Sequence, residues 1–232
     1  YNVSLFEQQA LEKLNELFVT NDIVILTGGS GLYIDALLFG IDDLPDIDPQ
    51  IRDQVKDAYL QNGIEFIRRE LRSIDPEYYA HVDLANPNRM MRAIEVFYQT
   101  GDKFSSLHKN EKKQRNFNTL KILLSRQRDE LNDRINARTD LMFEQGLLDE
   151  TKSLLQYRNE NALNTVGYKE LFKYLDGEYS LEMAKEKIKT NTRRYAKRQI
   201  TWFKRYDDWH VYHPGQIDEI IQLINKKVFN IG

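Results

Sequence analysis

The chain has 232 residues with a formal net charge of −3, and 41% of its residues are hydrophobic and 30% charged, a balance that is typical of a globular protein. No apolar run approaches the roughly 20 residues that a membrane-spanning helix requires, so no membrane partner is expected. The absence of cysteine excludes disulfides and thiolate metal sites and fits a reducing cytoplasm. The four histidines are scattered, and no zinc site is expected.

The N-terminal residues indicate a unit of an α/β protein. Residues 5–18 repeat apolar side chains at helical spacing, and residues 22–27 form a short β-branched run that is typical of a buried parallel strand. A glycine-rich turn at 28–31 follows that run directly, and residues 32–38 predict a second helix. Helix, strand, glycine turn and helix in this order predict a doubly wound parallel sheet with helices on both faces.

The middle of the chain predicts a helical insertion into that core. Helical periodicity dominates residues 50–72 and 87–99. The second of these helices has a clear start, because Asn86 stands at the N-cap and Pro87 at the first helical position. The segment before the first helix is rich in aspartate and proline, and it predicts an exit from the core. We therefore expect an insertion domain at 46–116.

The remaining residues predict a return to the α/β core, which would comprise residues 1–45 and 117–232. The expected strands lie at 120–124 and 209–212. The expected helices lie at 128–145, 148–157, 168–175, 180–205 and 216–228, and a polar connector spans 109–118. The predicted fold class is α/β, with a three-layer parallel-sheet core and a helical insertion.

The strongest charge signal lies near the C-terminus. Between Lys187 and Arg205 there are eight basic residues and no acidic one, so the rest of the chain is markedly acidic. On a helix, at about 100° per residue, the six basic residues from Arg193 onward fall within an arc of roughly 140°. The opposite side carries Tyr195, Ile200, Trp202 and Phe203.

Two interpretations of this basic helix are open. One face packs on the protein while the other binds the phosphates of a nucleic acid, or the charged face is only solvated. Solvated faces usually mix charges of both signs at helical spacing, and this one does not. The pattern therefore favours nucleic-acid binding.

Other motifs leave their alternatives open. The glycine turn at 28–31 lacks the Lys-Ser/Thr ending of a P-loop, so it is either a ligand-approaching turn or a structural connection. Arg89 and Arg92 lie one turn apart, as do Arg134 and Arg138, and such pairs clamp phosphates or form salt bridges. Tyr168 follows a glycine at a helix start, where it stacks on an unpaired base or simply begins a helix.

A series of short motifs runs through the chain in a fixed order: Gly28 to Ile34, Leu44 to Arg52, Asp75-Pro76, Asn86 to Val96, Thr100-Gly101, Leu131 to Arg138, Gln145 to Leu147, Val166 to Glu170 and Lys197 to Phe203. In these motifs the chain resembles the tRNA dimethylallyltransferases, from residue 1 to about residue 210. The resemblance covers nearly the whole chain.

The resemblance implies a fold related to P-loop NTPases, with a helical insertion domain that grips the anticodon stem-loop of tRNA. It implies transfer of a dimethylallyl group from dimethylallyl diphosphate to N6 of the adenosine at position 37. In this family Mg²⁺ and a P-loop hold the diphosphate, an N-terminal aspartate acts as general base, and the base is flipped out to react. Members of the family generally act as monomers.

Carried over residue by residue, the resemblance also implies roles for individual side chains. Arg134 would handle the diphosphate, which gains negative charge as it leaves. The implied tRNA contacts are Ser30, Arg52, Asn88, Arg89, Met90, Met91, Arg92, Asn164, Thr165, Val166, Gly167, Tyr168, Lys169, Lys197, Arg198, Gln199, Ile200, Thr201, Trp202, Phe203 and Lys204.

The chain departs from the family pattern in one respect. No Gly-x-x-x-x-Gly-Lys-Ser/Thr segment occurs in these 232 residues, nor does the early Asp-Ser segment of the family. The catalytic base and the Mg²⁺ ligands are therefore expected in an N-terminal segment that this sequence lacks, and the chain alone is expected to be inactive. The alternatives are a catalytically silent tRNA-binding module and a P-loop protein that acts on small molecules. The insertion and the basic helix argue against the second alternative.

Overall fold

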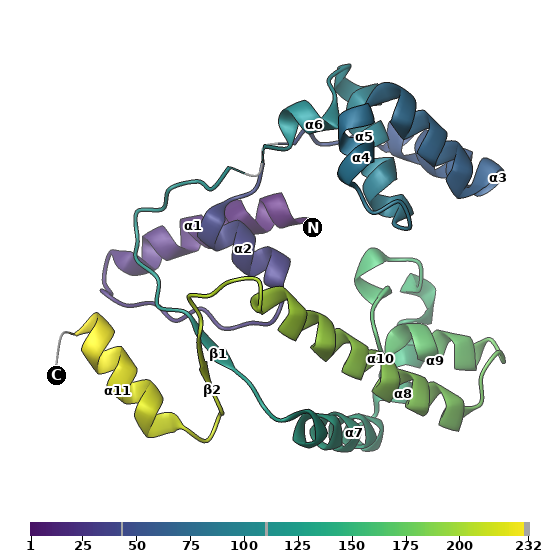
Figure 1. The fold of residues 1–232 in the computed structure, drawn as a ribbon. Coiled ribbons are helices and arrows are strands. Elements are labelled where there is room, and N and C mark those ends of the chain that lie inside the picture. The colour runs from purple at the N-terminus through teal and green to yellow at the C-terminus, as the bar shows by residue number, and fades with distance from the viewer. Residues whose placement is uncertain (43, 110, 230–232) are drawn as a thin grey trace. The chain divides into compact units, whose positions relative to one another are not determined.

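The computed structural model describes residues 1–42, 44–109 and 111–229. These residues form two compact units (Figure 1): one comprises residues 1–26, 32–42, 44–109 and 111–117, and the other comprises residues 27–31 and 118–229. The predicted connectors at 42–49 and 109–118 each contain one residue, 43 and 110 respectively, that lies outside the described part. The division into a core and an insertion at 46–116 remains a prediction.

The first unit begins with two helices that a buried ion pair fastens together. Helix α1 spans Val3–Phe18 and helix α2 spans Gly31–Phe39, which confirms the helices predicted at 5–18 and 32–38. Arg115 contacts Glu7 of α1 at 2.6 Å, and its guanidinium also donates to the carbonyl oxygens of Ala36 and Leu37 at 2.8 and 2.9 Å. Arg115 therefore adds a donor to the last carbonyls of α2, of which that of Ala36 also accepts from the Gly40 N–H at 2.9 Å, and it neutralises the buried Glu7.

The strand predicted at 22–27 is absent from the structure. These residues take no regular secondary structure, and Ile25 is 87% exposed. A strand satisfies its backbone N–H and C=O groups only through a neighbouring strand, and none among the described residues pairs with this segment. The prediction was wrong because β-branched composition reports the preference of a segment and not the presence of its partner.

Four helices of the first unit enclose a core of their own. They are α3 (Pro49–Ile74), α4 (Pro76–His81), α5 (Pro87–Thr100) and α6 (Phe104–Leu107). Their shared core consists of Ile47, Val55, Ile67, Leu71, Met90, Ala93, Ile94, Val96 and Phe104. Helix α3 breaks at Gly63, whose φ is 72°. The Asn86 side chain caps α5 by accepting from the Arg89 N–H at 3.3 Å, as the sequence predicted.

The two short helices of this unit were not predicted, and a buried carboxylate joins them. Asp75 caps α4 by accepting from the Tyr78 N–H at 3.0 Å. The same side chain accepts from the N–H and the hydroxyl of Ser105 in α6, both at 2.8 Å. Helices this short do not contain enough residues for apolar periodicity to be recognised in the sequence. They are stable because this tertiary contact holds them in place.

The second unit contains a two-stranded parallel sheet in its described part. Strand β1 (Ile122–Leu124) pairs with β2 (His210–Tyr212), with Ile122 opposite His210. The strands were predicted at 120–124 and 209–212, and both are confirmed with shorter bounds. The described residues thus show two strands of the predicted parallel sheet.

Helices account for most of the second unit, and they follow the predicted order. They are α7 (Arg128–Glu144), α8 (Leu147–Ser153), α9 (Tyr168–Leu175), α10 (Leu181–Phe203) and α11 (Ile217–Val228), with short 3₁₀ turns at Leu155–Tyr157 and Asn161–Leu163. The buried residues Leu147, Leu171, Ala184 and Ile188 join α8, α9 and α10. No helix in the described part of the chain is long and apolar enough to cross a membrane.

Candidate RNA-binding site

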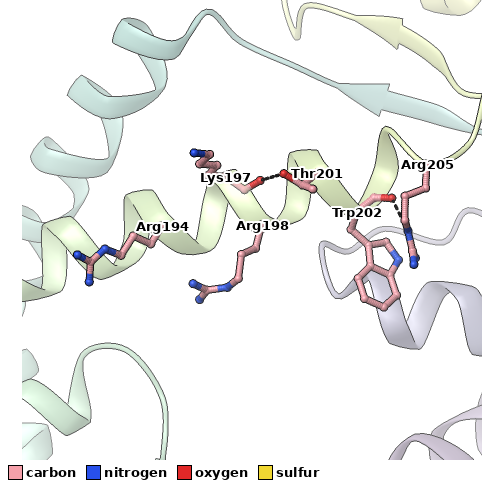
Figure 2. Close-up of a pocket in the computed structure, with 6 residues that line it drawn as sticks. All are labelled: Arg194, Lys197, Arg198, Thr201, Trp202 and Arg205. Carbon is pink, nitrogen blue, oxygen red and sulfur yellow. Dashed lines mark hydrogen bonds between the residues drawn. The ribbon is translucent and has the colours of Figure 1, made fainter. Parts of the chain in front are cut away.

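Helix α10 carries the basic stripe that the sequence predicted. The Ser180 hydroxyl caps the helix by accepting from the Met183 N–H at 3.1 Å. Along its C-terminal half and the turn that follows, six residues line an open hollow of about 480 Å³: Arg194, Lys197, Arg198, Thr201, Trp202 and Arg205. Figure 2 shows Arg194, Arg198 and Trp202 projecting from the same side of the helix. None of the six lining residues is acidic.

Several cations of this stripe are not neutralised by an acidic side chain in the described part of the protein. Lys197, Arg198 and Lys204 are exposed, and none of them forms an ion pair with another described residue. Further toward the N-terminus of the same helix, Lys189 contacts Asp140 at 2.9 Å. The guanidinium of Arg198 instead lies over the ring of Tyr195 at 5.6 Å. Such a stripe of unneutralised cations suits a phosphate backbone.

Two residues of α10 lie on the opposite face from the one predicted. The Arg193 side chain is half-buried and donates to the side-chain oxygens of Asn136 in α7 and Thr190, at 2.7 and 3.0 Å. Tyr195, expected on the packed side, is 44% exposed. The helical wheel was wrong here because the partner helix decides which face is covered, and α7 offers Arg193 a hydrogen-bond acceptor.

Three of the tRNA contacts that the resemblance implied, Met90, Gly167 and Phe203, are buried in this structure. Met90 has no exposed surface and lies in the core of the first unit. Phe203 is 5% exposed, and its ring centroid lies 5.0 Å from that of Trp209. Both side chains pack inside the protein and present little or no surface to solvent. Gln199 and Ile200 are half-buried.

The glycine turn at 28–31 lies against α10. The amide nitrogen of Gln199 donates to the carbonyl oxygen of Gly29 at 2.8 Å. A Cβ built on Gly31 would lie 2.2 Å from Cδ1 of Trp202, so no other residue fits there without displacing the indole. Ser30 is held between these two contacts and is half-buried. Sequence reasoning treated the turn and the basic helix as separate features, and no local signal linked them.

The segment at 164–169 leads into the first residues of α9 and depends on a second glycine. Gly167 has a φ of 108°, which favours glycine, and its N–H donates to Oε2 of Glu170 at 2.8 Å. The Tyr168 hydroxyl donates to Glu150 at 2.9 Å, and this hydrogen bond raises the pKa of Tyr168. Among the implied contacts here, Asn164, Thr165 and Lys169 are exposed, while Val166 and Tyr168 are half-buried.

In the first unit, α5 presents arginines of two kinds. Arg89 and its neighbour Asn88 are exposed, whereas Met91 and Arg92 are half-buried. The Arg92 guanidinium donates to the carbonyl oxygen of Pro45 at 3.0 Å and lies 3.8 Å from the Glu95 carboxylate. Burial lowers the pKa of Arg92. Arg92 thus holds the segment that leads into α3, and Arg89 remains available to a ligand.

The buried Glu95 links α5 to Arg52. Burial raises the pKa of Glu95, and the positive charges of Arg52 and Arg92 oppose that effect. Arg52 lies exposed in the first turns of α3. The Asp48 N–H, at the start of the same helix, donates to the side-chain oxygen of Gln99 at 3.1 Å. Helix α5 therefore positions the segment that presents Arg52.

The remaining predicted residue, Arg134, lies on α7. It is exposed, as is Arg138 one turn later, and neither forms an ion pair within the described part of the chain. Arg134 does not line the hollow on α10. Among the described residues, no group of three or more His, Asp or Glu side chains is placed so that it could hold a metal ion.

Comparisons with known proteins agree along the chain. The family model described as IPP transferase matches residues 1–206. A tRNA dimethylallyltransferase of Bacteroides thetaiotaomicron is 50% identical over 97% of this chain and 73% of its own length. One from Flavobacterium johnsoniae is 46% identical over 97% of this chain and 75% of its own length.

Solved structures give the same result. The full-length tRNA isopentenylpyrophosphate transferase of Bacillus halodurans matches with a TM-score of 0.65 and 32% identity, over 99% of this chain and 75% of that one. A eukaryotic dimethylallyltransferase solved while acting on tRNA matches in fold with a TM-score of 0.76 and 24% identity, over 100% of this chain and 63% of that one. The fold, rich in helices with a small parallel sheet among the described residues, is that of P-loop NTPase-like transferases. The chain belongs to the IPP transferase family, the tRNA dimethylallyltransferases, which are tRNA-modifying prenyltransferases.

Proposed function

We propose that this protein transfers the dimethylallyl group of dimethylallyl diphosphate to N6 of the adenosine at position 37 of tRNA, as a monomer in the cytoplasm. The observation that carries the proposal is the basic stripe on α10, in a chain whose family membership covers residues 1–206. In this proposal the stripe binds the phosphates of the anticodon stem-loop, because each neutralised phosphate adds affinity through counterion release.

Three exposed segments would share the grip on the RNA. On α10 and at its C-cap they include Lys197, Arg198, Thr201 and Lys204, and in the turn that leads into α9 and its first residues they include Asn164, Thr165 and Lys169. On the first unit, Arg52, Asn88 and Arg89 are exposed and would bind the stem-loop as part of the insertion domain. Met90 and Phe203 are left out of this set because they are buried.

The transfer forms one bond and breaks another. The N6 atom of adenosine attacks C1 of the donor, the C1–O bond breaks, and diphosphate leaves with the electron pair. One N6 proton then passes to a base, which gives N6-dimethylallyladenosine. Arg134, which is exposed and forms no ion pair with another described residue, would stabilise the negative charge that develops on the diphosphate.

Mg²⁺ would assist by neutralising the diphosphate, but the described residues offer no cluster of three or more acidic or histidine side chains for it. The described residues therefore do not fit a magnesium site. The lining of the α10 hollow agrees with this, since it contains cations, a threonine and an indole and no carboxylate or imidazole.

The test is transfer of a labelled dimethylallyl group into an unmodified anticodon stem-loop, with a stem-loop carrying guanosine at position 37 as the control. The chain is compared with a form that also carries a P-loop segment at its N-terminus. Label in the adenosine RNA alone, with the extended form, supports the proposal. Retained RNA binding with no transfer by either form would instead support the silent tRNA-binding module.

A further inference from the structure

A buried glutamate connects two segments that the proposed function places against RNA. Glu170 lies in the first turn of α9 and is 6% exposed. One carboxylate oxygen, Oε2, accepts from the Gly167 N–H at 2.8 Å. The other, Oε1, accepts from the side-chain amide nitrogen of Asn191 in α10 at 2.7 Å. The carboxylate thus joins the turn at 164–169 to the basic helix.

The orientation of Asn191 extends this connection to the hollow. A carboxylate only accepts hydrogen bonds, so the Asn191 nitrogen must face Glu170 and its oxygen faces the other way. That oxygen accepts from Nη1 of Arg194 at 3.3 Å. Arg194 lines the hollow on α10. One chain of hydrogen bonds therefore runs from Gly167 through Glu170 and Asn191 to Arg194.

We propose that Glu170 and Asn191 are positioning residues that couple the conformation of the turn at 164–169 to the direction in which Arg194 presents its guanidinium to RNA. The inference rests on the proposed RNA binding. Burying a carboxylate is costly unless its hydrogen bonds are satisfied, and here both oxygens have partners. Each group in this series of hydrogen bonds has a fixed role as donor or acceptor. A change in the turn at 164–169 therefore reorients the Arg194 side chain at the other end of the series.

Replacing Glu170 by glutamine keeps the size of the side chain but disrupts the series of donors and acceptors from Gly167 to Arg194. The single oxygen of the introduced amide is needed by the Gly167 N–H, so its nitrogen faces Asn191. Asn191 must then turn its oxygen toward position 170 and its amide nitrogen toward Arg194, where two donors meet. E170Q therefore releases Arg194. N191D fails for a different reason, because it places a second carboxylate against Glu170.

The double variant E170Q/N191D restores a matching donor and acceptor for every hydrogen bond in this series. The amide oxygen introduced at position 170 accepts from Gly167, and the amide nitrogen donates to the carboxylate introduced at position 191. The second oxygen of that carboxylate accepts from Arg194. We expect E170Q and N191D each to weaken binding of an anticodon stem-loop by about tenfold. The slope of the logarithm of the binding constant against the logarithm of the salt concentration should become shallower by about 0.7. That is the amount expected for the loss of one phosphate contact on a single strand. The double variant should recover both quantities.

Two further variants keep the test decisive if E170Q folds poorly. N191A leaves the contact between Gly167 and Glu170 in place and removes the link to Arg194, so it should show the shallower salt dependence. It also leaves Oε1 of the buried Glu170 without its partner, so its melting temperature should fall as well. T151A, at a buried threonine of α8 whose hydroxyl donates to a carbonyl of its own helix, should lower the melting temperature and keep the wild-type salt dependence.

The outcomes separate this inference from the proposed function. If the wild-type protein fails to bind the stem-loop, the proposed function fails. If the wild-type protein binds and N191A keeps its salt dependence, or if E170Q/N191D binds no better than the single variants, Glu170 and Asn191 have only a structural role and the inference is overturned.

Discussion

Helices α5 and α10 both carry arginines at helical spacing, yet the structure uses them differently. On α5, Arg92 is half-buried against Glu95 and the carbonyl of Pro45, and Arg89 is exposed. On α10, Lys197 and Arg198 are exposed and form no ion pair within the described residues. The difference lies in the local acid: α5 includes Glu95 one turn after Arg92, whereas no acidic residue lies between 187 and 205.

The comparison shows that the number of cations on a helix says little about how many of them reach a ligand. A buried acid fixes a nearby arginine as a structural part of the protein, and the absence of an acid leaves the cations to an external anion. We expect variants on α10 to change RNA binding and its salt dependence, and variants around Glu95 to change stability first.

The largest effect is expected from charge reversal on α10. K197E/R198E removes two exposed cations and places two negative charges in the path of the phosphates. We expect the affinity for an anticodon stem-loop to fall by roughly a hundredfold and the salt dependence to become shallower by about two phosphate contacts. Binding measured across a series of salt concentrations gives both quantities.

The matched control is K226E/K227E in the last turn of α11, which changes the net charge by the same amount at exposed positions. It should bind RNA nearly as the wild type does. An equal loss in both double variants would mean that net charge alone, and not the α10 stripe, determines the affinity.

The next largest effect is expected on stability, from substitutions at the three glycines of the turn that packs against α10. A Cβ at Gly31 would lie 2.2 Å from the ring of Trp202, and one at Gly29 would lie 2.3 Å from the flexible end of Gln199. At Gly28 a Cβ would meet nothing within 4 Å. We expect G31A to lower the free energy of unfolding by about 1–3 kcal/mol, G29A by less, and G28A hardly at all. Denaturant unfolding of the three variants tests this order, and a G28A variant as unstable as G31A would contradict it.

The helix and strand predictions failed in different places and for different physical reasons. The hydrogen bonds of a helix lie within one segment, so the apolar periodicity at 5–18, 87–99 and 180–205 was sufficient evidence. The segment at 22–27 had strand composition, but its structure depends on a partner that composition does not report. The short helices α4 and α6 were missed because Asp75 and Ser105, far apart in the sequence, hold them in place.

The candidate site could be predicted in its charge but not in its contacts. The α10 stripe was found from the sequence because the lack of acidic residues is a local property. The directions in which Arg193 and Tyr195 point were not found from the sequence, because they depend on Asn136 of another helix. The contacts of Gln199 and Trp202 with the glycine turn join residues about 170 positions apart, and no periodicity reports such a distance.

A third prediction concerns the two arginines of α5. R92A removes the hydrogen bond to Pro45 and leaves Glu95 buried with less compensation, so it should lower the free energy of unfolding by about 1–2 kcal/mol. R89A, one turn earlier and exposed, should leave stability nearly unchanged and weaken only RNA binding. Thermal unfolding and stem-loop binding are measured on both. Equal stability of R92A and R89A would show that Arg92 does not hold the segment leading into α3.

The smallest effect, and the most specific, is expected at Glu95 itself. Burial raises the pKa of this carboxyl, and Arg52 is the charge that most opposes the rise. R52A should therefore raise the pKa of Glu95 further, as followed by NMR titration of its side-chain carboxyl. A raised pKa means that the folded protein binds this proton more tightly than the unfolded chain does. Stability then falls as the pH increases from the ordinary carboxyl pKa through the raised one, and R52A should extend that fall to higher pH.

R89A serves as the control, because Arg89 has no part in the shift of Glu95. If the pKa of Glu95 is the same in R52A and the wild type, Arg52 does not act on the buried carboxylate, and the link from α5 to the first turns of α3 is purely steric.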